Sequence, residues 1–236
     1  MKLTRSLLSL ILALLLVFSL GAAVFAADYP ESGFADVPRD VWYTKAVDYV
    51  KAEGLMKGVG ENRFDPTGKV TRAMVVTVLY RMMEQPDVTG MQTKFTDIRV
   101  GTYYEKAVIW AANSGVVNGV TDTAFAPDAF ITREQMAAMV MRMLLTFADD
   151  ESRAQLEQIE QLDPTGAARQ QMLKETFTDA AAVSPYARTY VLLCKEGGIM
   201  KGDKAGTFRP QETLSRAECA QTFLNLSEIG ASLNVQ

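Results

Sequence analysis

The stretch ITREQMAAMVMRM, residues 131–143, decides the fold because it indicates a helix with one buried face. Thr132 with Gln135 three positions later is typical of a capping box, in which side chains and backbone bond reciprocally at a helix start. Apolar residues then recur three, four and seven positions apart, which predicts a buried stripe. The stripe consists of Met136, Met139, Val140 and Met143. Arg133 departs from this pattern, since the helix dipole opposes a cation in the first turn.

Two further copies of this pattern stand in VTRAMVVTVLYRM (70–82) and LSRAECAQTFLNL (214–226). Ahead of each copy come a Phe-x-Asp segment, an aromatic residue, a glycine pair and a Phe-x-Pro segment. We therefore expect an all-α fold of three helix–loop–helix repeats, at 34–84, 95–147 and 177–229. A unit of about fifty residues cannot bury its apolar face alone, so the repeats should pack on one another.

The composition excludes several classes of function. The 236 residues carry a formal net charge of −4 and contain no histidine. Without histidine there is no Ser–His triad and no imidazole metal ligand, and two cysteines are too few for a structural zinc site. A net acidic chain also lacks the basic face that nucleic-acid binding needs. We expect a protein with no enzymatic activity, no catalytic residue, no metal, no cofactor and no nucleic-acid partner.

Residues 1–26 are typical of a secretory signal peptide. Lys2 and Arg5 form a charged start, residues 7–20 are apolar, and small residues follow, with cleavage expected after Ala26. The apolar run is short for a membrane span, and a retained membrane anchor is the alternative. We expect a secreted protein without a membrane span after cleavage.

Residues 148–176 form a charged connector between the second and third repeats. Leu156, Ile159 and Leu162 would form one apolar edge of a helix that the following proline and glycine would end. We expect a surface helix that covers the bundle. The alternative is a docking helix for an envelope protein or for a second copy of the chain.

The two cysteines, Cys194 and Cys219, stand at positions where another repeat has a core valine. We expect buried free thiols. The alternative is a disulfide that clamps the two helices of the third repeat, since exported proteins commonly form disulfides.

Three in-register copies of Phe-x-Asp, an aromatic residue, Gly-x-x-x-Gly, Phe-x-Pro and Thr-Arg resemble the S-layer homology (SLH) triplet, whose members anchor proteins to bacterial cell envelopes. The resemblance covers residues 34–229. It implies repeats around a pseudo-threefold axis with a central helical bundle. It also implies grooves between repeats that bind secondary cell-wall polysaccharide, often bearing a pyruvate ketal on N-acetylmannosamine. The expected function is a non-catalytic anchor for an anionic, pyruvylated glycan at the wall or S-layer of a bacterium.

In this family a Thr-Arg-Ala-Glu motif supplies the arginine that meets the pyruvate carboxylate. Here the motif stands as VTRAM (70–74), ITREQ (131–135) and LSRAE (214–218). The resemblance thus implies three ligand arginines, Arg72, Arg133 and Arg216. A planar guanidinium can grip a carboxylate through two hydrogen bonds, and a free N–H at the helix start would add to the anion site. The alternative is an ion pair with the Phe-x-Asp aspartate of an adjoining repeat.

Other repeated positions are further ligand candidates. They are Asp36, Asp97, Asp179, Trp42, Tyr103, Gly54, Gly115 and Gly198. The aspartates would otherwise hold the turn before the first helix, and the glycines would end that helix as C-caps. The aromatic residues, with Tyr186 in the third repeat, either stack on a sugar ring or pack in the core. A last group has a structural capping role, namely Thr71, Thr132, Gln135, Ser215 and Glu218.

A second class of function is structural, in which the protein is a lattice component or adaptor of the envelope that acts by self-association. This hypothesis rests on the chain ending at Gln236, soon after the last repeat, where anchors usually carry another domain. A glycan hydrolase is a weaker third class, because no acidic residue recurs by repeat position apart from the Phe-x-Asp aspartates.

Overall fold

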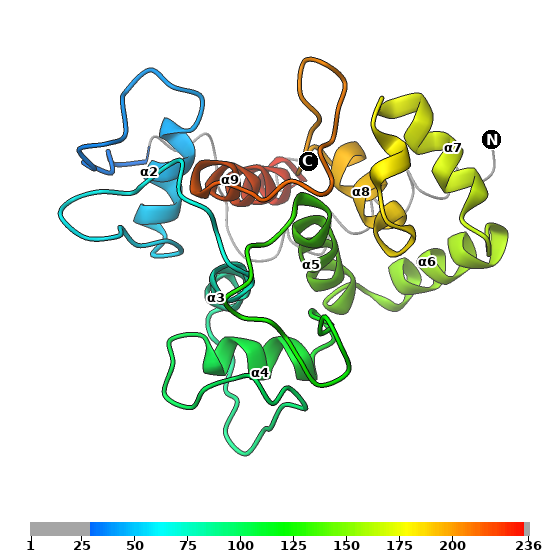
Figure 1. Cartoon of the computed structure of the whole chain (residues 1–236), viewed down its shortest axis with the longest axis horizontal. Helices are drawn as coiled ribbons and strands as arrows, with labels where there is room; N and C mark the ends of the chain where they lie inside the picture. The colour runs from blue at the N-terminus through cyan, green and yellow to red at the C-terminus, as the bar shows by residue number, and fades with distance from the viewer. Residues whose placement is uncertain (1–28, 234–236) are drawn as a thin grey trace. The chain divides into compact units, whose positions relative to one another are not determined.

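The computed structural model describes residues 29–233 and is shown in Figure 1. Within that range the secondary structure is helical, with isolated β-bridges and no β-strand. The prediction of an all-α fold is therefore confirmed. The predicted signal peptide, residues 1–26, lies outside the described residues.

Each predicted repeat contains two helices separated by a loop. The first helices are α2 (Thr44–Ala52), α4 (Glu105–Asn113) and α8 (Arg188–Glu196). The second helices are α3 (Arg72–Met82), α5 (Arg133–Thr146) and α9 (Arg216–Leu233). The connector forms α6 (Asp150–Leu162) and α7 (Ala167–Thr176), and the short 3-10 helices η2 (Ala180–Ala182) and η3 (Pro185–Ala187) precede α8.

The described chain divides into two compact units. The N-terminal unit comprises residues 29–131 and 213–224, and the C-terminal unit comprises residues 132–212 and 225–233. In the N-terminal unit α3 packs on α4, and in the C-terminal unit α5 packs on α8 (Figure 1). The second helix of one repeat thus packs on the first helix of the next, as expected for repeats that share their core. The expected placement of the repeats around a pseudo-threefold axis stays a prediction.

The apolar stripes are buried within each unit. Val75, Val78 and Leu79 of α3 are at most 3% exposed, and so are the four stripe residues of α5. The methionines therefore fill the core of the C-terminal unit, where their flexible side chains suit irregular spaces. In every repeat the opening Phe packs against the Phe of Phe-x-Pro, with ring centroids 5.3–5.7 Å apart.

A glycine with a left-handed backbone follows the first helix of each repeat. The φ angles of Gly54, Gly115 and Gly198 are +65°, +77° and +72°. A Cβ added at Gly54 or Gly115 would meet no atom within 4 Å, so the backbone angle rather than crowding requires glycine. These glycines occupy the position at which helices commonly end in a left-handed residue.

The second helices begin with side-chain caps. The Thr132 hydroxyl accepts a hydrogen bond from the Gln135 N–H, and the Gln135 side chain accepts one from the Thr132 N–H. Ser215 and Glu218 make the same reciprocal pair, whereas Thr71 accepts from the N–H of Met74. Two copies therefore have the complete capping box, and one has the cap alone.

Replacing Thr132 by alanine should lower the free energy of unfolding by about 1 kcal/mol, because one N–H at the start of α5 loses its acceptor. Thr132→Ser keeps the hydroxyl and should retain most of the stability. Denaturant titrations of both variants check this expectation, and equal losses would argue against the cap.

The connector forms two helices where the sequence predicted one. The predicted helix corresponds to α6, in which Ile159 is fully buried and Leu162 is half exposed. Before α7, the carboxylate of Asp163 accepts hydrogen bonds from the N–H groups of Ala168 and Arg169. The Arg169 side chain pairs with Asp163 at 3.1 Å and donates to the hydroxyl of Thr189 in α8 at 2.7 Å. These bonds fix the connector to the third repeat, which supports its role as a covering segment.

Both cysteines are free and buried, as expected, and the disulfide alternative is wrong. Burial raises the pKa of the Cys219 thiol to about 12 and that of Cys194 further still. The thiols therefore act as small apolar side chains of the core.

Candidate functional site

Arg133, the first residue of α5, is 6% exposed and points into the loop of the third repeat. Its Nε donates to the carbonyl of Phe208 at 2.6 Å, and Nη2 donates to the carbonyl of Lys201 at 3.1 Å. The guanidinium also lies over the Phe208 ring, 5.1 Å from the centroid. We call this arrangement the arginine clasp. Sequence analysis did not predict it, because the acceptors are backbone carbonyls that leave no residue signature.

The other two repeats build the same clasp. Arg72 donates to the carbonyls of Phe125 and Asn118 in the second repeat, at 2.8 and 3.2 Å. Arg216 donates to those of Phe64 and Lys57 in the first repeat, at 2.6 and 2.7 Å. Their guanidiniums lie 4.7 and 4.5 Å from the Phe125 and Phe64 ring centroids. Each arginine therefore binds the loop of the following repeat, and the third binds the first.

The helix starts do not offer the free N–H groups that the sequence analysis expected. The N–H of Arg133 donates to Glu212 and that of Glu134 to Pro210, at 2.9 and 3.0 Å. In the other copies the corresponding N–H groups donate to carbonyls of the next loop in the same way. The third N–H of each helix donates to the cap side chain. An anion-binding helix terminus is therefore not part of this site.

The Phe-x-Asp aspartates hold the same loops from the opposite side. Asp36 accepts hydrogen bonds from the N–H groups of Phe64 and Asp65, both at 2.8 Å. Burial disfavours the charged carboxyl, but these N–H groups outweigh it and hold the pKa of Asp36 below its usual range. The backbone of Phe64 is thus bound on both sides: its N–H donates to Asp36, and its carbonyl accepts from Arg216. Asp97 and Asp179 bind the equivalent Phe residues at 2.9 and 2.8 Å.

The residue after each of these phenylalanines has a strained backbone. Asp65, Ala126 and Arg209 have φ angles of +58°, +57° and +59°, an uncommon conformation for residues other than glycine. Each donates its N–H to the aspartate of its own repeat at 2.7–2.8 Å. The aspartates therefore stabilise a turn about 28 residues downstream instead of the turn before the first helix.

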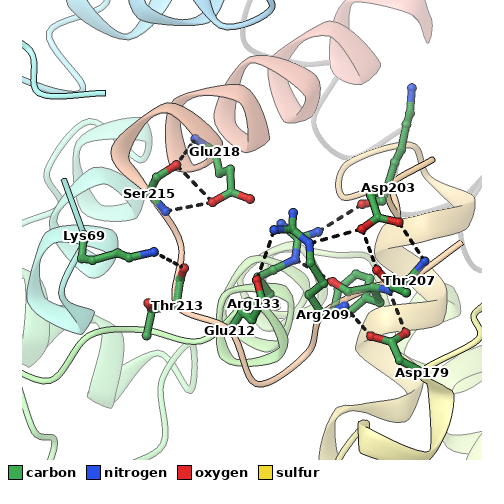
Figure 2. A network of polar contacts seen from close by, with 12 residues as sticks. Lys69, Arg133, Asp179, Asp203, Thr207, Arg209, Glu212, Thr213, Ser215 and Glu218 are labelled. Carbon is green, nitrogen blue, oxygen red and sulfur yellow. Dashed lines mark hydrogen bonds and ion pairs between the residues drawn. The ribbon is translucent and has the colours of Figure 1, made fainter. Parts of the chain in front are cut away.

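In the third repeat a second carboxylate orders the loop that supplies the clasp (Figure 2). Asp203 accepts hydrogen bonds from the Thr207 N–H at 3.0 Å and hydroxyl at 2.6 Å, which lower the pKa of Asp203. The Arg209 Nε lies 3.7 Å from the same carboxylate. The Lys201 and Phe208 carbonyls bound by Arg133 thus belong to a loop that is held together by contacts of the Asp203 carboxylate with Thr207 and Arg209.

The aromatic candidates lie at the surface. Trp42, Tyr103 and Tyr186 are 62%, 61% and 48% exposed, so the core-packing alternative is wrong for all three. In the second repeat the next residue, Tyr104, takes the buried position at 3% exposure, with its ring perpendicular to that of Tyr103. One aromatic residue packs inward and its neighbour remains available to a ligand.

Two of these exposed rings border the helix start that carries the clasp arginine. The Tyr186 hydroxyl donates to the carboxylate of Glu134, next to Arg133, at 3.1 Å. The Tyr103 hydroxyl likewise interacts with the Thr71 side chain, next to Arg72, and this interaction favours the charged form of the phenol, although burial raises its pKa overall. We call these places the Arg133 site and the Arg72 site, and the equivalent place with Trp42 and Arg216 the Arg216 site. The Arg133 and Arg72 sites each combine a surface aromatic ring with the helix start that carries the buried arginine of the preceding repeat.

Over residues 29–233 the structure contains no group of three or more acidic or cysteine side chains placed to hold a metal ion. In the same range no helix has the length and apolar character to cross a bilayer.

Comparison with known proteins identifies each repeat. The family model described as S-layer homology domain matches residues 33–73, 94–137 and 176–220. An amylopullulanase of Thermoanaerobacterium thermosulfurigenes is 27% identical over 86% of this chain and 10% of that protein. The surface-layer 125 kDa protein of Lysinibacillus sphaericus is 24% identical over 76% of this chain and 13% of that protein. A cellulosome-anchoring protein of Acetivibrio thermocellus is 30% identical over 47% of this chain and 26% of that protein. The chain therefore spans between about a tenth and a quarter of these relatives' lengths.

Proposed function

Because the chain belongs to the S-layer homology domain family, we propose that it is a non-catalytic anchor that binds an acidic, pyruvylated secondary cell-wall polysaccharide. The family and its surface-layer relatives indicate a secreted protein of the cell surface.

The observation that carries the proposal is the exposed aromatic ring beside the helix start of a buried arginine at the Arg133 and Arg72 sites. A surface Trp or Tyr ring offers a flat apolar face to a sugar at low entropic cost. The clasp arginines carry guanidinium cations and are at most 7% exposed. Since this charge is buried, solvent screens it weakly, and it favours an anionic ligand over a neutral one.

The arginines then have a double role. The clasp holds two repeats together and places a fixed cation near the exposed ring. The proposed ligand has a sugar face for the ring and a carboxylate for the cation, and a pyruvate ketal on a hexosamine has both. The aspartates support the site indirectly, since they order the turn that the arginine binds.

The exposed rings permit a test that spares the fold. A variant with Trp42, Tyr103 and Tyr186 all replaced by alanine should bind purified cell-wall sacculi at least about tenfold more weakly, because each site loses its stacking surface. Met91→Ala removes an exposed apolar side chain (47%) from a loop outside the sites and should leave binding unchanged. Sedimentation of each protein with sacculi measures this.

Sacculi from cells that lack wall pyruvylation supply the second arm of the experiment. The wild-type protein should bind them at least about tenfold more weakly than pyruvylated sacculi, as expected for loss of a charged partner. Equal binding to both preparations would exclude pyruvate as the recognised group.

A further inference from the structure

The Arg133 site contains a buried carboxylate. Glu134 follows Arg133 in α5 and is 3% exposed. Its Oε2 accepts the Ser184 N–H at 2.9 Å, and its Oε1 accepts the Tyr186 hydroxyl at 3.1 Å. The carboxylate is thus fixed by hydrogen bonds between the helix start and the exposed ring of the same site.

The other two sites have alanine at this position. Ala73 and Ala217 follow the clasp arginines of the first and third repeats and are 1% and 3% exposed. The third repeat also has an acidic residue, Glu218, but the structure shows its Oε2 accepting from the Ser215 N–H and hydroxyl, at 2.9 and 3.0 Å (Figure 2). That carboxylate caps α9, whereas Glu134 bonds the aromatic ring. The Arg72 site, which has Ala73 and Met74, is therefore the clearest contrast to the Arg133 site.

A carboxylate in this position changes what the site accepts. A ligand that stacks on the Tyr186 ring and carries its own carboxylate would bring two like charges close together in a partly desolvated place, which is unfavourable. An ionised carboxylate has about four acceptor positions, of which Ser184 and Tyr186 use two. An uncharged sugar stacked on the Tyr186 ring would bring no second negative charge near Glu134.

We propose that Glu134 is a specificity-determining residue that makes the Arg133 site take a neutral N-acetylated sugar of the wall polysaccharide and reject the acidic one. This inference rests on the proposed function, to which it adds a division of labour. The Arg72 site binds the pyruvylated residue, and the Arg133 site binds an uncharged residue. The wall polysaccharide then supplies two different sugars to two sites that share a clasp arginine and an exposed aromatic ring.

Single-site proteins test the proposal. Trp42→Ala with Tyr103→Ala leaves the ring of the Arg133 site, and Trp42→Ala with Tyr186→Ala leaves that of the Arg72 site. The probes are N-acetylmannosamine with a pyruvate ketal and the same sugar without it, titrated by NMR. We expect the Arg72-site protein to prefer the ketal at least tenfold and the Arg133-site protein to prefer the ketal-free sugar.

Two substitutions then isolate the charge. In the Arg133-site protein, Glu134→Gln keeps a side chain of the same shape and removes the charge, and Glu134→Ala installs the residue of the other copies. Both should raise affinity for the ketal at least tenfold. If both sites of the starting proteins prefer the ketal equally, or if neither substitution raises its affinity, the role of Glu134 is overturned while the proposed function stands. If the Arg72-site protein does not bind the ketal, both proposals fail.

Discussion

Replacing Arg133 by alanine is expected to lower the free energy of unfolding by about 4 kcal/mol, since hydrogen bonds to charged groups contribute about 1.5–3 kcal/mol each and two are lost. The carbonyls of Phe208 and Lys201 would lose their donors, and the Phe208 ring would lose the cation above it. The free energy of unfolding of Arg133→Lys should lie between those of wild type and Arg133→Ala, because an ammonium lacks the planar fork that reaches both carbonyls. Denaturant titration followed by circular dichroism measures the effect.

Arg153→Ala is the matched control for this prediction. Arg153 lies on α6, is about half exposed, and pairs with the fully exposed Asp150. Exposed ion pairs contribute about 0–1 kcal/mol, so this change should cost little. A loss at Arg133 no larger than the loss at Arg153 would contradict the clasp. Because alanine at Arg133 should weaken the fold, reduced glycan binding by that variant cannot be assigned to a lost ligand contact.

Replacing Asp36 by alanine should lower the free energy of unfolding by about 3 kcal/mol, because the N–H groups of Phe64 and Asp65 lose a charged acceptor. Asp65 would also keep its unfavourable φ angle without the bond that stabilises it. Asp40→Ala, four residues away on the exposed surface, should stay within about 0.5 kcal/mol of wild type. Equal losses for the two variants would contradict a role for Asp36 in the turn.

The contribution of Asp36 should also depend on pH. The native pKa of Asp36 lies below the ordinary value of 3.8, so the native protein binds this proton less readily than the unfolded chain does. The stabilisation is therefore complete above about pH 4 and is lost as the pH falls through the depressed native pKa. The difference in unfolding free energy between wild type and Asp36→Asn should shrink over that acidic range. A difference that stays constant would argue against the bonded carboxylate.

The sequence predicted what depends on periodicity and local chemistry. The stripe of α5, the capping pair Thr132–Gln135 and the left-handed glycines all follow from rules that act within a few residues. The expectation that repeats pack on one another followed from the size of the unit. Helix α7 was missed because its start is capped by Asp163, which the sequence analysis did not consider.

The site was predicted less completely, for a physical reason. Repetition identified the arginines, aspartates and aromatic residues, but not their partners, because backbone carbonyls and N–H groups are present at every residue. The exposure of Trp42 and Tyr103 was equally invisible, since an aromatic residue beside a second aromatic residue gives no sign of which one faces inward. Glu134 was visible in the ITREQ segment, yet its partner Tyr186 lies 52 residues away.

The use of backbone acceptors in the clasp has a consequence for how the three repeats diverge. The residues whose carbonyls bind Nη2 are two lysines, Lys57 and Lys201, and an asparagine, Asn118, so the bond is the same with side chains of different charge and size. Loop side chains at these positions are free to change without loss of the bond. The contact between repeats is therefore insensitive to side-chain substitution at its acceptor positions, and the loop sequences can diverge while each arginine keeps its bonds.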